Sequence, residues 1–228
     1  MSNFIVFDGQ LGSGKTLGAV VFANYLKSKS PNTVLYSNFG MKNAKEFTSL
    51  RHFLEVAGNP SSIIVLDEAH VDLDARSFNS NHVKFITATS FYLRKIRATL
   101  ILTSPLFENL DSRIRAITNV LCLVSKDKSY FYYEMYDPTS NKHLGTKKIR
   151  KQKAFHLNLY DTNAIVTQLD VPAKKEEFDK FLFELKQTTM NYYKKDKTDG
   201  ATKALAFGGH KYNNNIFPER GVNFEKTY

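Results

Sequence analysis

A glycine-rich run near the start of the chain has the composition and spacing of a loop that binds phosphate groups. It reads Gly9-Gln10-Leu11-Gly12-Ser13-Gly14-Lys15-Thr16, with four free positions between the first glycine and Gly-Lys-Thr. Glycines let the backbone curl so that its N–H groups point at phosphates, and a helix that follows adds its positive end. In this pattern the lysine reaches the β- and γ-phosphates, and the threonine hydroxyl coordinates Mg²⁺. We therefore expect ATP and Mg²⁺ to bind here, through Gly9, Gly12, Ser13, Gly14, Lys15 and Thr16.

Two adjacent carboxylates follow an apolar run further along the chain. Residues 63–66 read as a strand that delivers Asp67-Glu68 at its C-terminal end, the Walker B pattern. Asp67 would hold the magnesium shell through Thr16 or water, and Glu68 would orient and polarise the attacking water. Many nucleotide kinases need only the aspartate, because their acceptor is a bound substrate. The second carboxylate therefore favours ATP hydrolysis, and the branch of P-loop proteins with an extra strand between the loop strand and the acidic strand.

Several residues after the acidic pair are candidates for contacts with the γ-phosphate. The arginines among them are Arg76, Arg94, Arg113 and Arg115. In ring ATPases an arginine of one subunit approaches the γ-phosphate held by its neighbour and stabilises the transition-state charge. We favour Arg113 for this role, then Arg115, and we expect Thr103 to sense the γ-phosphate from the strand beside the phosphate loop. An ordinary surface salt bridge is the alternative for each arginine.

These candidate residues need strands and helices that place them at one edge of a sheet. Short apolar runs predict strands at residues 3–7, 33–36, 63–66, 99–102 and 120–124. Helices are expected between them, at residues 15–26, 49–56, 81–97 and 108–116. Because strands alternate with helices over about the first 125 residues, we predict an α/β fold with a mainly parallel sheet.

The pattern changes after the fifth predicted strand. Residues 120–125 and 130–136 read as an antiparallel hairpin at one edge of the sheet. A C-terminal helix is expected at residues 173–186, where the apolar side chains share one face. From Thr188 the chain shows no clear period, which predicts an irregular arm or tail. We therefore divide the chain into an ATPase domain and a C-terminal arm, at residues 1–187 and 188–228.

The chain is basic, and part of that charge is concentrated in one stretch. The net charge is +10 and the pI is about 9.5, which suits an anionic partner. No acidic residue interrupts the stretch that contains Lys142, Lys147, Lys148, Arg150, Lys151 and Lys153. This stretch could grip DNA phosphates without reading sequence. The alternative is a solvated basic loop.

Composition disfavours two other classes of protein. Cys122 is the only cysteine, so the chain forms no internal disulfide and no cysteine-based zinc site. No window approaches the roughly 18 to 20 apolar residues of a membrane helix, and Asp8 interrupts the first apolar run. We therefore expect a soluble protein with no signal peptide and no direct insertion into a membrane.

Together these motifs resemble the FtsK/HerA superfamily of DNA-translocating ATPases, and most of all the small genome-packaging ATPases of tailless, membrane-containing icosahedral viruses. The resemblance covers about residues 1–125 and rests on Gly9 to Thr16, Asp67-Glu68-Ala69-His70, Arg76, Arg94-Lys95 and Asp111-Ser112-Arg113-Ile114-Arg115. It implies a RecA-like fold and a homo-oligomeric, hexameric ring that pumps double-stranded DNA into a preformed capsid. It also implies capsid or membrane-vertex proteins as partners, at the packaging vertex of the virion and in the host cytoplasm. Thr103-Ser104-Pro105 stands where the family often has a glutamine.

The same residues are also similar to the Zot-like assembly ATPases of filamentous phages, which typically carry a membrane-spanning helix. That resemblance implies a phage assembly or export ATPase in place of a packaging motor. Two further hypotheses are a nucleotide switch that recruits partners during virion morphogenesis, and a small-molecule or nucleotide kinase. Glu68 and the lack of an evident substrate lid in the sequence disfavour the kinase.

Overall fold

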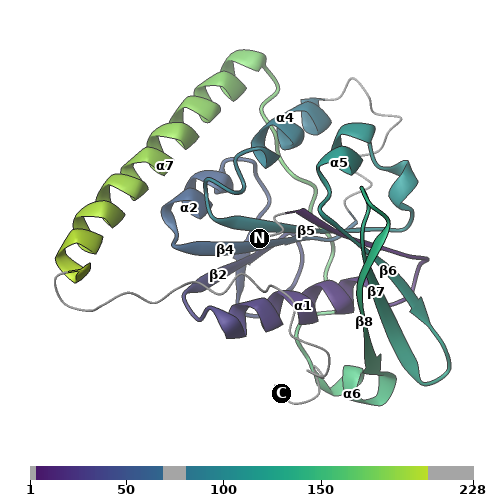
Figure 1. Cartoon of the computed structure of the whole chain (residues 1–228). Helices are drawn as coiled ribbons and strands as arrows, with labels where there is room; N and C mark the ends of the chain where they lie inside the picture. The colour runs from purple at the N-terminus through teal and green to yellow at the C-terminus, as the bar shows by residue number, and fades with distance from the viewer. Residues whose placement is uncertain (1–3, 69–80, 205–228) are drawn as a thin grey trace.

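One mixed sheet organises the chain in the computed structural model, which describes residues 4–68 and 81–204 (Figure 1). Its strand order is β3-β2-β4-β5-β1-β6-β7-β8. The strands are β1 Phe4–Asp8, β2 Thr33–Ser37, β3 Ala44–Glu46, β4 Ser61–Leu66, β5 Ala98–Ser104, β6 Val120–Lys126, β7 Tyr130–Asp137 and β8 Lys142–Arg150. The α-helices are α1 Lys15–Lys29, α2 His52–Gly58, α4 Asn81–Ser90, α5 Ser112–Ile117, α6 Lys151–His156 and α7 Lys175–Ala204.

The strands from β3 to β6 in this order run parallel to one another. β5 is buried along its whole length and lies between β1 and β4. Parallel strands covered by helices need apolar side chains on both faces, and β1, β4 and β5 have them. The predicted parallel α/β sheet is confirmed, and so is the extra strand between the phosphate-loop strand and the acidic strand.

Two hydrophobic cores lie on the two faces of the sheet. One core takes residues from α2, α4, α5 and α7, and in it Phe85 stacks on Phe178 with 3.9 Å between ring centroids. The other core takes the buried side of α1 and the inner side of β6, β7 and β8. In Figure 1, α1 accordingly lies below the strands, whereas α2 and α4 lie above them.

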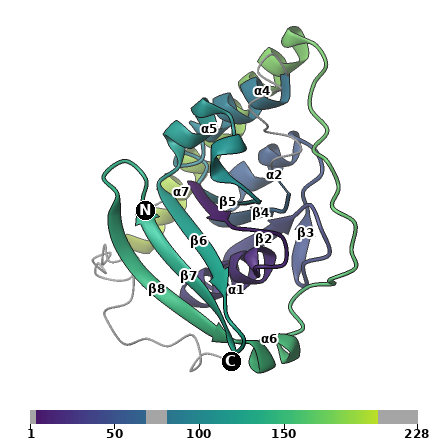
Figure 2. The ribbon, with the colours of Figure 1, turned by 90° about the vertical axis from the view of Figure 1, so that its right-hand side faces the viewer.

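β6, β7 and β8 form the outer edge of the sheet (Figure 2). β7 pairs antiparallel with β6 and with β8, so the predicted edge hairpin is confirmed. The basic stretch that follows is not a loop, because residues 142–150 form β8. Within β8, Ile149 is buried in the core below the sheet, while Lys148 and Arg150 are exposed. Few apolar residues mark this strand, which explains why its sequence did not predict it.

The helix expected at residues 81–97 is shorter than predicted, because α4 ends at Ser90. The hydroxyls of Thr89 and Ser90 each donate to a backbone carbonyl one turn earlier. Side chains that bond to nearby backbone compete with the continuation of a helix. Turns then lead to Arg97, whose φ is 56°, before β5 begins.

The C-terminal helix is longer than predicted. α7 continues to Ala204, whereas the apolar spacing predicts an end near Lys186. The first part of the segment predicted as irregular is therefore helical, and residues 205–228 lie outside the described residues. Across residues 4–68 and 81–204, we find no helix with both the length and the apolar character to cross a membrane.

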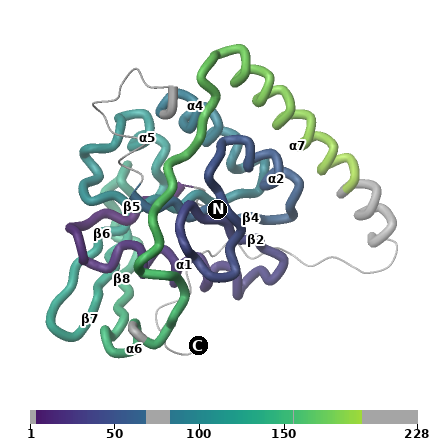
Figure 3. Tube along the Cα trace, turned by 180° about the vertical axis from the view of Figure 1, so that it is seen from behind, coloured from purple at the N-terminus to yellow at the C-terminus, as the bar shows by residue number. Residues whose placement is uncertain are grey.

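A segment without regular structure, residues 157–170, connects the region of α6 to the start of α7 (Figure 3). We call it the crossing segment. Its backbone bonds to the loop after β2, where the N–H of Lys42 donates to the carbonyl of Leu159 at 2.9 Å. The N–H of Asp161 donates to the carbonyl of Gly40 at 2.8 Å. These bonds hold the crossing segment beside the carboxyl ends of the parallel strands.

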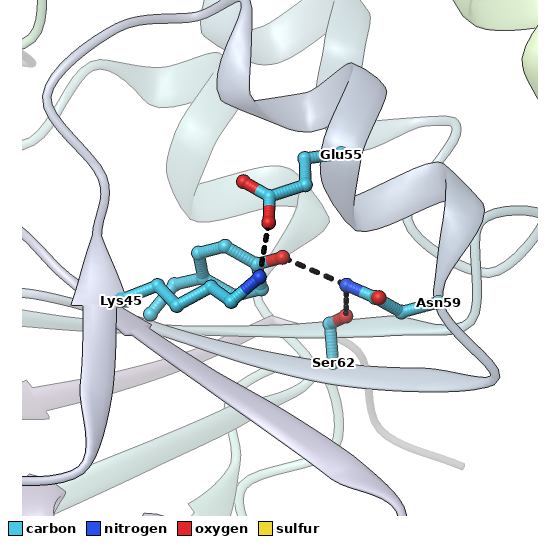
Figure 4. Close-up of polar contacts among 5 residues, drawn as sticks. Lys45, Glu55, Asn59 and Ser62 are labelled. Atoms are coloured by element: carbon cyan, nitrogen blue, oxygen red, sulfur yellow. Dashed lines mark hydrogen bonds and ion pairs between the residues drawn. The ribbon is translucent and has the colours of Figure 1, made fainter.

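A polar cluster joins β2, α2 and β4 (Figure 4). The amide of Asn59 donates to the Tyr36 hydroxyl at 2.7 Å and to Ser62 Oγ at 3.3 Å, and Lys45 pairs with Glu55 nearby. Tyr36 is fully buried, so its hydroxyl needs such a partner, and burial raises its pKa. The cluster fixes β2 against β4, whose ends contribute to the candidate site.

Candidate active site

The loop between β1 and α1 is a curled backbone. Gly12 and Gly14 have φ angles of 68° and 98°, which residues with a Cβ rarely adopt. At Gly14 a Cβ would also lie 2.6 Å from Cδ1 of Phe131, so this position excludes a side chain. Lys15 begins α1 at the positive end of the helix, and its ammonium donates to the Gln10 carbonyl at 3.1 Å. The loop thus places the ammonium of Lys15 beside a backbone whose curl depends on glycine.

The acidic pair faces this loop at the end of β4. Thr16 Oγ1 lies 3.0 Å from both carboxylate oxygens of Asp67. The Thr103 hydroxyl, near the end of β5, donates to Asp67 and accepts from the backbone N–H of Glu68 at 3.1 Å. Glu68 itself has a φ of 52°, a left-handed conformation that turns the chain sharply after the strand. The structure therefore brings four predicted residues together, one from α1, one from β5 and the acidic pair itself.

Asn38, directly after β2, is a site residue that the sequence analysis missed. Its side chain accepts from the N–H of Asp67 at 2.9 Å and donates to the carbonyl of Asp67 at 3.3 Å. The same amide donates to the carbonyl of Thr167 in the crossing segment at 3.2 Å. Asn38 is buried, so these bonds fix the backbone of the acidic pair. The available signal was a polar residue that directly follows an apolar strand.

A cleft of about 590 Å³ opens between the phosphate loop and the acidic pair. Lys15, Thr16 and Asp67 line this cleft. Phe131 of β7 and residues of the crossing segment, including Tyr160, line it as well. These apolar residues lie beyond the part of the chain that carries the phosphate-site motifs, so no spacing pattern predicted them.

Burial changes the proton affinity of two charged groups beside the loop. Desolvation lowers the pKa of Lys15, while the negative charges of Asp67, Asp8 and Glu68 act in the opposite direction. Desolvation raises the pKa of Asp8, although the N–H of Phe107 donates to its carboxylate at 3.0 Å. The carboxylates only partly offset the cost of burying the ammonium of Lys15. An arriving phosphate would stabilise this cation.

The oxygen groups in the cleft suit a hard cation. Thr16 offers a hydroxyl and Asp67 a carboxylate, and Mg²⁺ prefers such oxygen ligands. Mg²⁺ usually takes one or two protein carboxylates together with phosphate oxygens and water. The residues present therefore fit Mg²⁺ that arrives with a nucleotide, with Thr16 and Asp67 on its protein side.

Comparisons with known proteins agree with this architecture. No protein-family model and no curated protein sequence matches the chain. The N-terminal domain of zonular occludens toxin from Neisseria meningitidis is similar in structure, with a TM-score of 0.50 and 18% identity, over 71% of this chain and 100% of that domain. The chain has the RecA-like P-loop NTPase fold. The predicted fold class is confirmed.

Two other P-loop ATPases are also similar in structure. The genome packaging NTPase B204 from Sulfolobus turreted icosahedral virus 2, solved with ATP-gammaS, has a TM-score of 0.47 and 12% identity, over 64% of this chain and 96% of its own. A DnaB-like replicative helicase has a TM-score of 0.49 and 13% identity, over 65% of this chain and 56% of its own.

The residues of the phosphate loop, or P-loop, line two different hollows. Gly12, Gly14, Lys15 and Thr16 line the cleft, whereas Gly9 and Ser13 line a second hollow beside β6. In that second hollow a Cβ on the first glycine would lie 2.5 Å from a backbone oxygen of β6. The first glycine is therefore required for close packing of the loop on the sheet.

The predicted arginine fingers do not line the P-loop cleft of their own chain. Arg113 binds Asp111 through Nε at 2.8 Å and through a second guanidinium nitrogen at 3.0 Å. This contact lowers the pKa of Asp111, which is buried and caps α5. Arg115 is half-buried in the same helix. Action of either arginine on a neighbouring subunit stays a prediction, and Arg76 and Ala69-His70 lie outside the described residues.

Proposed function

We propose that this chain binds ATP with Mg²⁺ and hydrolyses the γ-phosphate bond. The observation that carries the proposal is the 3.0 Å contact between Thr16 and Asp67, made in one cleft with Lys15. Backbone amides of the P-loop and the ammonium of Lys15 would bind the β- and γ-phosphates. Mg²⁺, when bound, would neutralise charge on the phosphates.

Glu68 would orient the water that attacks the γ-phosphate. It lines the cleft, and its backbone N–H is fixed by Thr103, which also bonds to Asp67. Thr103 therefore joins the carboxylate of Asp67 to the backbone N–H of Glu68 through a single hydroxyl. This connection supports the predicted sensor role of Thr103, because a change at Asp67 would reach the backbone that carries Glu68.

We further propose that hydrolysis drives movement along double-stranded DNA, in a homo-oligomeric ring that packages a viral genome into a preformed capsid. The sequence resemblance and the net charge of +10 support this finer proposal. In such a ring Arg113 or Arg115 would complete the site of a neighbouring subunit. The protein would act at the packaging vertex of the virion, next to capsid or membrane-vertex proteins.

The second candidate function is a phage assembly or export ATPase. It is favoured by the sequence similarity to Zot-like ATPases, and the toxin domain with the same fold is covered over its whole length. Both candidates need the same ATP site. What distinguishes them is the cargo that ATP hydrolysis moves. A nucleotide switch is the third candidate, and a stable monomer with turnover far below about 1 s⁻¹ would favour it.

The test is Glu68→Gln in the full chain, with ATP hydrolysis measured with and without double-stranded DNA at several salt concentrations. We expect turnover to fall at least about 100-fold while binding of an ATP analogue is retained, because a positioned general base contributes about 10² to 10⁴ in rate. Glu46→Gln is the matched control, since Glu46 is exposed on β3. Unchanged turnover in Glu68→Gln would overturn the assigned role of Glu68, and a lack of ATP hydrolysis by the unsubstituted protein would overturn the hydrolysis proposal.

The cargo and the assembly are tested on the unsubstituted protein. Double-stranded DNA should stimulate hydrolysis, and a mass measurement with ATP analogue and DNA should give a closed oligomer. Hydrolysis that is indifferent to DNA at every salt concentration would overturn the motor and leave the ATPase proposal standing.

A further inference from the structure

The antiparallel edge of the sheet has an outer face that is chemically different from its inner face. Along β7, Phe131, Tyr133 and Met135 point into the core shared with α1. Because side chains alternate along a strand, Tyr130, Tyr132 and Tyr136 point to the opposite side. Among the described residues, none of these three rings belongs to either hydrophobic core. We call this side of β6, β7 and β8 the tyrosine face.

Cations lie directly beside the tyrosine rings. Tyr130 pairs with Arg150 and Tyr132 pairs with Lys148 across the β7–β8 ladder. The Lys148 ammonium lies 5.0 Å from the centroid of the Tyr130 ring, and the Arg150 guanidinium lies 5.8 Å from it. Both cations are exposed. The ladder therefore places aromatic rings and positive charge side by side along one face.

The two carboxylates close to the rings are already engaged. The Tyr132 hydroxyl donates to Asp127 at 2.6 Å, and the Tyr136 hydroxyl donates to Glu134 at 2.9 Å. Cations outnumber carboxylates in this part of the chain, since residues 120–153 contain eight lysines and arginines against three aspartates and glutamates. The local charge thus favours an anionic ligand.

The tyrosine face is open on the β6 side. Leu123, which pairs with Glu134, is 40% exposed, and Ser125, which pairs with Tyr132, is exposed. Figure 2 shows β8 at the free edge of the sheet, with β7 and β6 beside it. A ligand can therefore lie across the strands from β8 toward β6.

We propose that the tyrosine face binds single-stranded nucleic acid. Unpaired bases can stack on the rings of Tyr130 and Tyr132, whose centroids are 6.2 Å apart, and phosphates can contact Lys148 and Arg150. Stacking of this kind tolerates any base sequence, because every base has a flat aromatic surface. Bases inside a duplex are already paired and stacked, so the face prefers single strands to duplexes. This binding does not depend on ATP hydrolysis.

Binding to the full chain is measured by fluorescence anisotropy with a labelled oligothymidine, without nucleotide. The double variant Tyr130→Ala/Tyr132→Ala should weaken binding at least about tenfold, since stacking on one aromatic contributes about 1–3 kcal/mol per base. The variant Tyr130→Phe/Tyr132→Phe keeps the rings and loses the bond to Asp127, so it should bind like the unsubstituted protein. Loss of binding in the phenylalanine variant would overturn the stacking argument.

The charge contribution is tested by Lys148→Ala/Arg150→Ala, which should reduce the slope of log affinity against log salt by about one to two. Lys180→Ala/Lys186→Ala removes two exposed cations from α7 and is the matched control. If the control variant reduces the slope of log affinity against log salt by the same amount, the binding reflects non-specific attraction to positive charge. That result would overturn the proposed site.

Competition experiments identify the ligand. Unlabelled oligothymidine should displace the probe at least about tenfold better than a duplex of the same length. Competition by unlabelled oligouridine then shows whether the face prefers RNA or DNA. Equal competition by the duplex would overturn the proposal and would indicate phosphate contacts alone. Basal ATP hydrolysis of the tyrosine variants should be unchanged, so failure of this proposal and failure of the ATPase proposal are distinguishable.

Discussion

The parallel part of the sheet and its antiparallel edge place functional groups in opposite ways. In the parallel part the strand interiors are buried on both faces, and the polar groups Asn38, Asp67 and Thr103 lie at or just beyond the carboxyl ends. In β7 and β8 only one face is buried, and tyrosines and cations occupy the other face along the strands. Helices on both faces leave only the ends of parallel strands for chemistry, whereas an open antiparallel face offers its whole length.

The two parts meet at the P-loop. Tyr133 of β7 donates its hydroxyl to the Gly14 carbonyl at 3.1 Å, and its ring excludes a Cβ at Gly18, which would lie 2.1 Å from Cε1. The antiparallel edge therefore supports the loop from one side, while the parallel part supplies the carboxylates from the other. This comparison predicts that changes in the parallel part alter chemistry most, and that changes in the edge alter stability first.

Lys15→Ala should have the largest effect. ATP turnover should fall at least about 100-fold, because a preorganised charge at the reacting phosphate is removed. The folded protein without nucleotide should not lose stability, since desolvation disfavours the ammonium of Lys15 and lowers its pKa. Turnover and melting temperature are measured together, with Lys42→Ala, at an exposed lysine after β2, as the control. A large loss of stability in Lys15→Ala would contradict the assigned role.

Asn38→Ala should have an intermediate effect on both properties. The change leaves the backbone of Asp67 without two of its bonds, and a lost buried partner costs about 1–3 kcal/mol of unfolding free energy. We also expect kcat to fall more than the affinity for ATP, because the acidic pair loses its position. Denaturant unfolding and steady-state kinetics check this.

Asn24→Ala is the matched control for Asn38→Ala, since the Asn24 side chain makes one bond within α1, to Val20. If the two variants behave alike in kcat, Asn38 has no special relation to the acidic pair. This result would contradict the inference that residues at the ends of the parallel strands affect the chemistry more than other residues of that part.

Tyr133→Phe should have the smallest effect. It removes one hydrogen bond to the P-loop, which stabilises by about 0.5–1.5 kcal/mol, and leaves the ring in place. Burial raises the pKa of Tyr133, so the hydroxyl remains a neutral donor at physiological pH. Tyr132→Phe, at an exposed hydroxyl of the same strand, should change the unfolding free energy less. Equal losses of unfolding free energy in Tyr133→Phe and Tyr132→Phe would show that β7 does not support the loop.

Local patterns in the sequence were sufficient for most of the parallel part. Short apolar strands, the glycine spacing of the P-loop and the carboxylates after β4 depend on neighbours within a few residues, so their signals survive in the sequence alone. The edge hairpin was also predictable, because β6 and β7 are joined by a tight connection. β8 was not, since Ile149 is one of few apolar residues that mark its buried side.

The sequence by itself determined the fold class and predicted the phosphate-site residues, because glycine freedom and apolar runs act locally. Only the tertiary structure decided that Asn38 holds Asp67, that Phe131 and the crossing segment complete the cleft, and that the tyrosines of β7 share a face with the cations of β8. These contacts join residues far apart along the chain, and their partners follow from strand order and register, which no local pattern encodes.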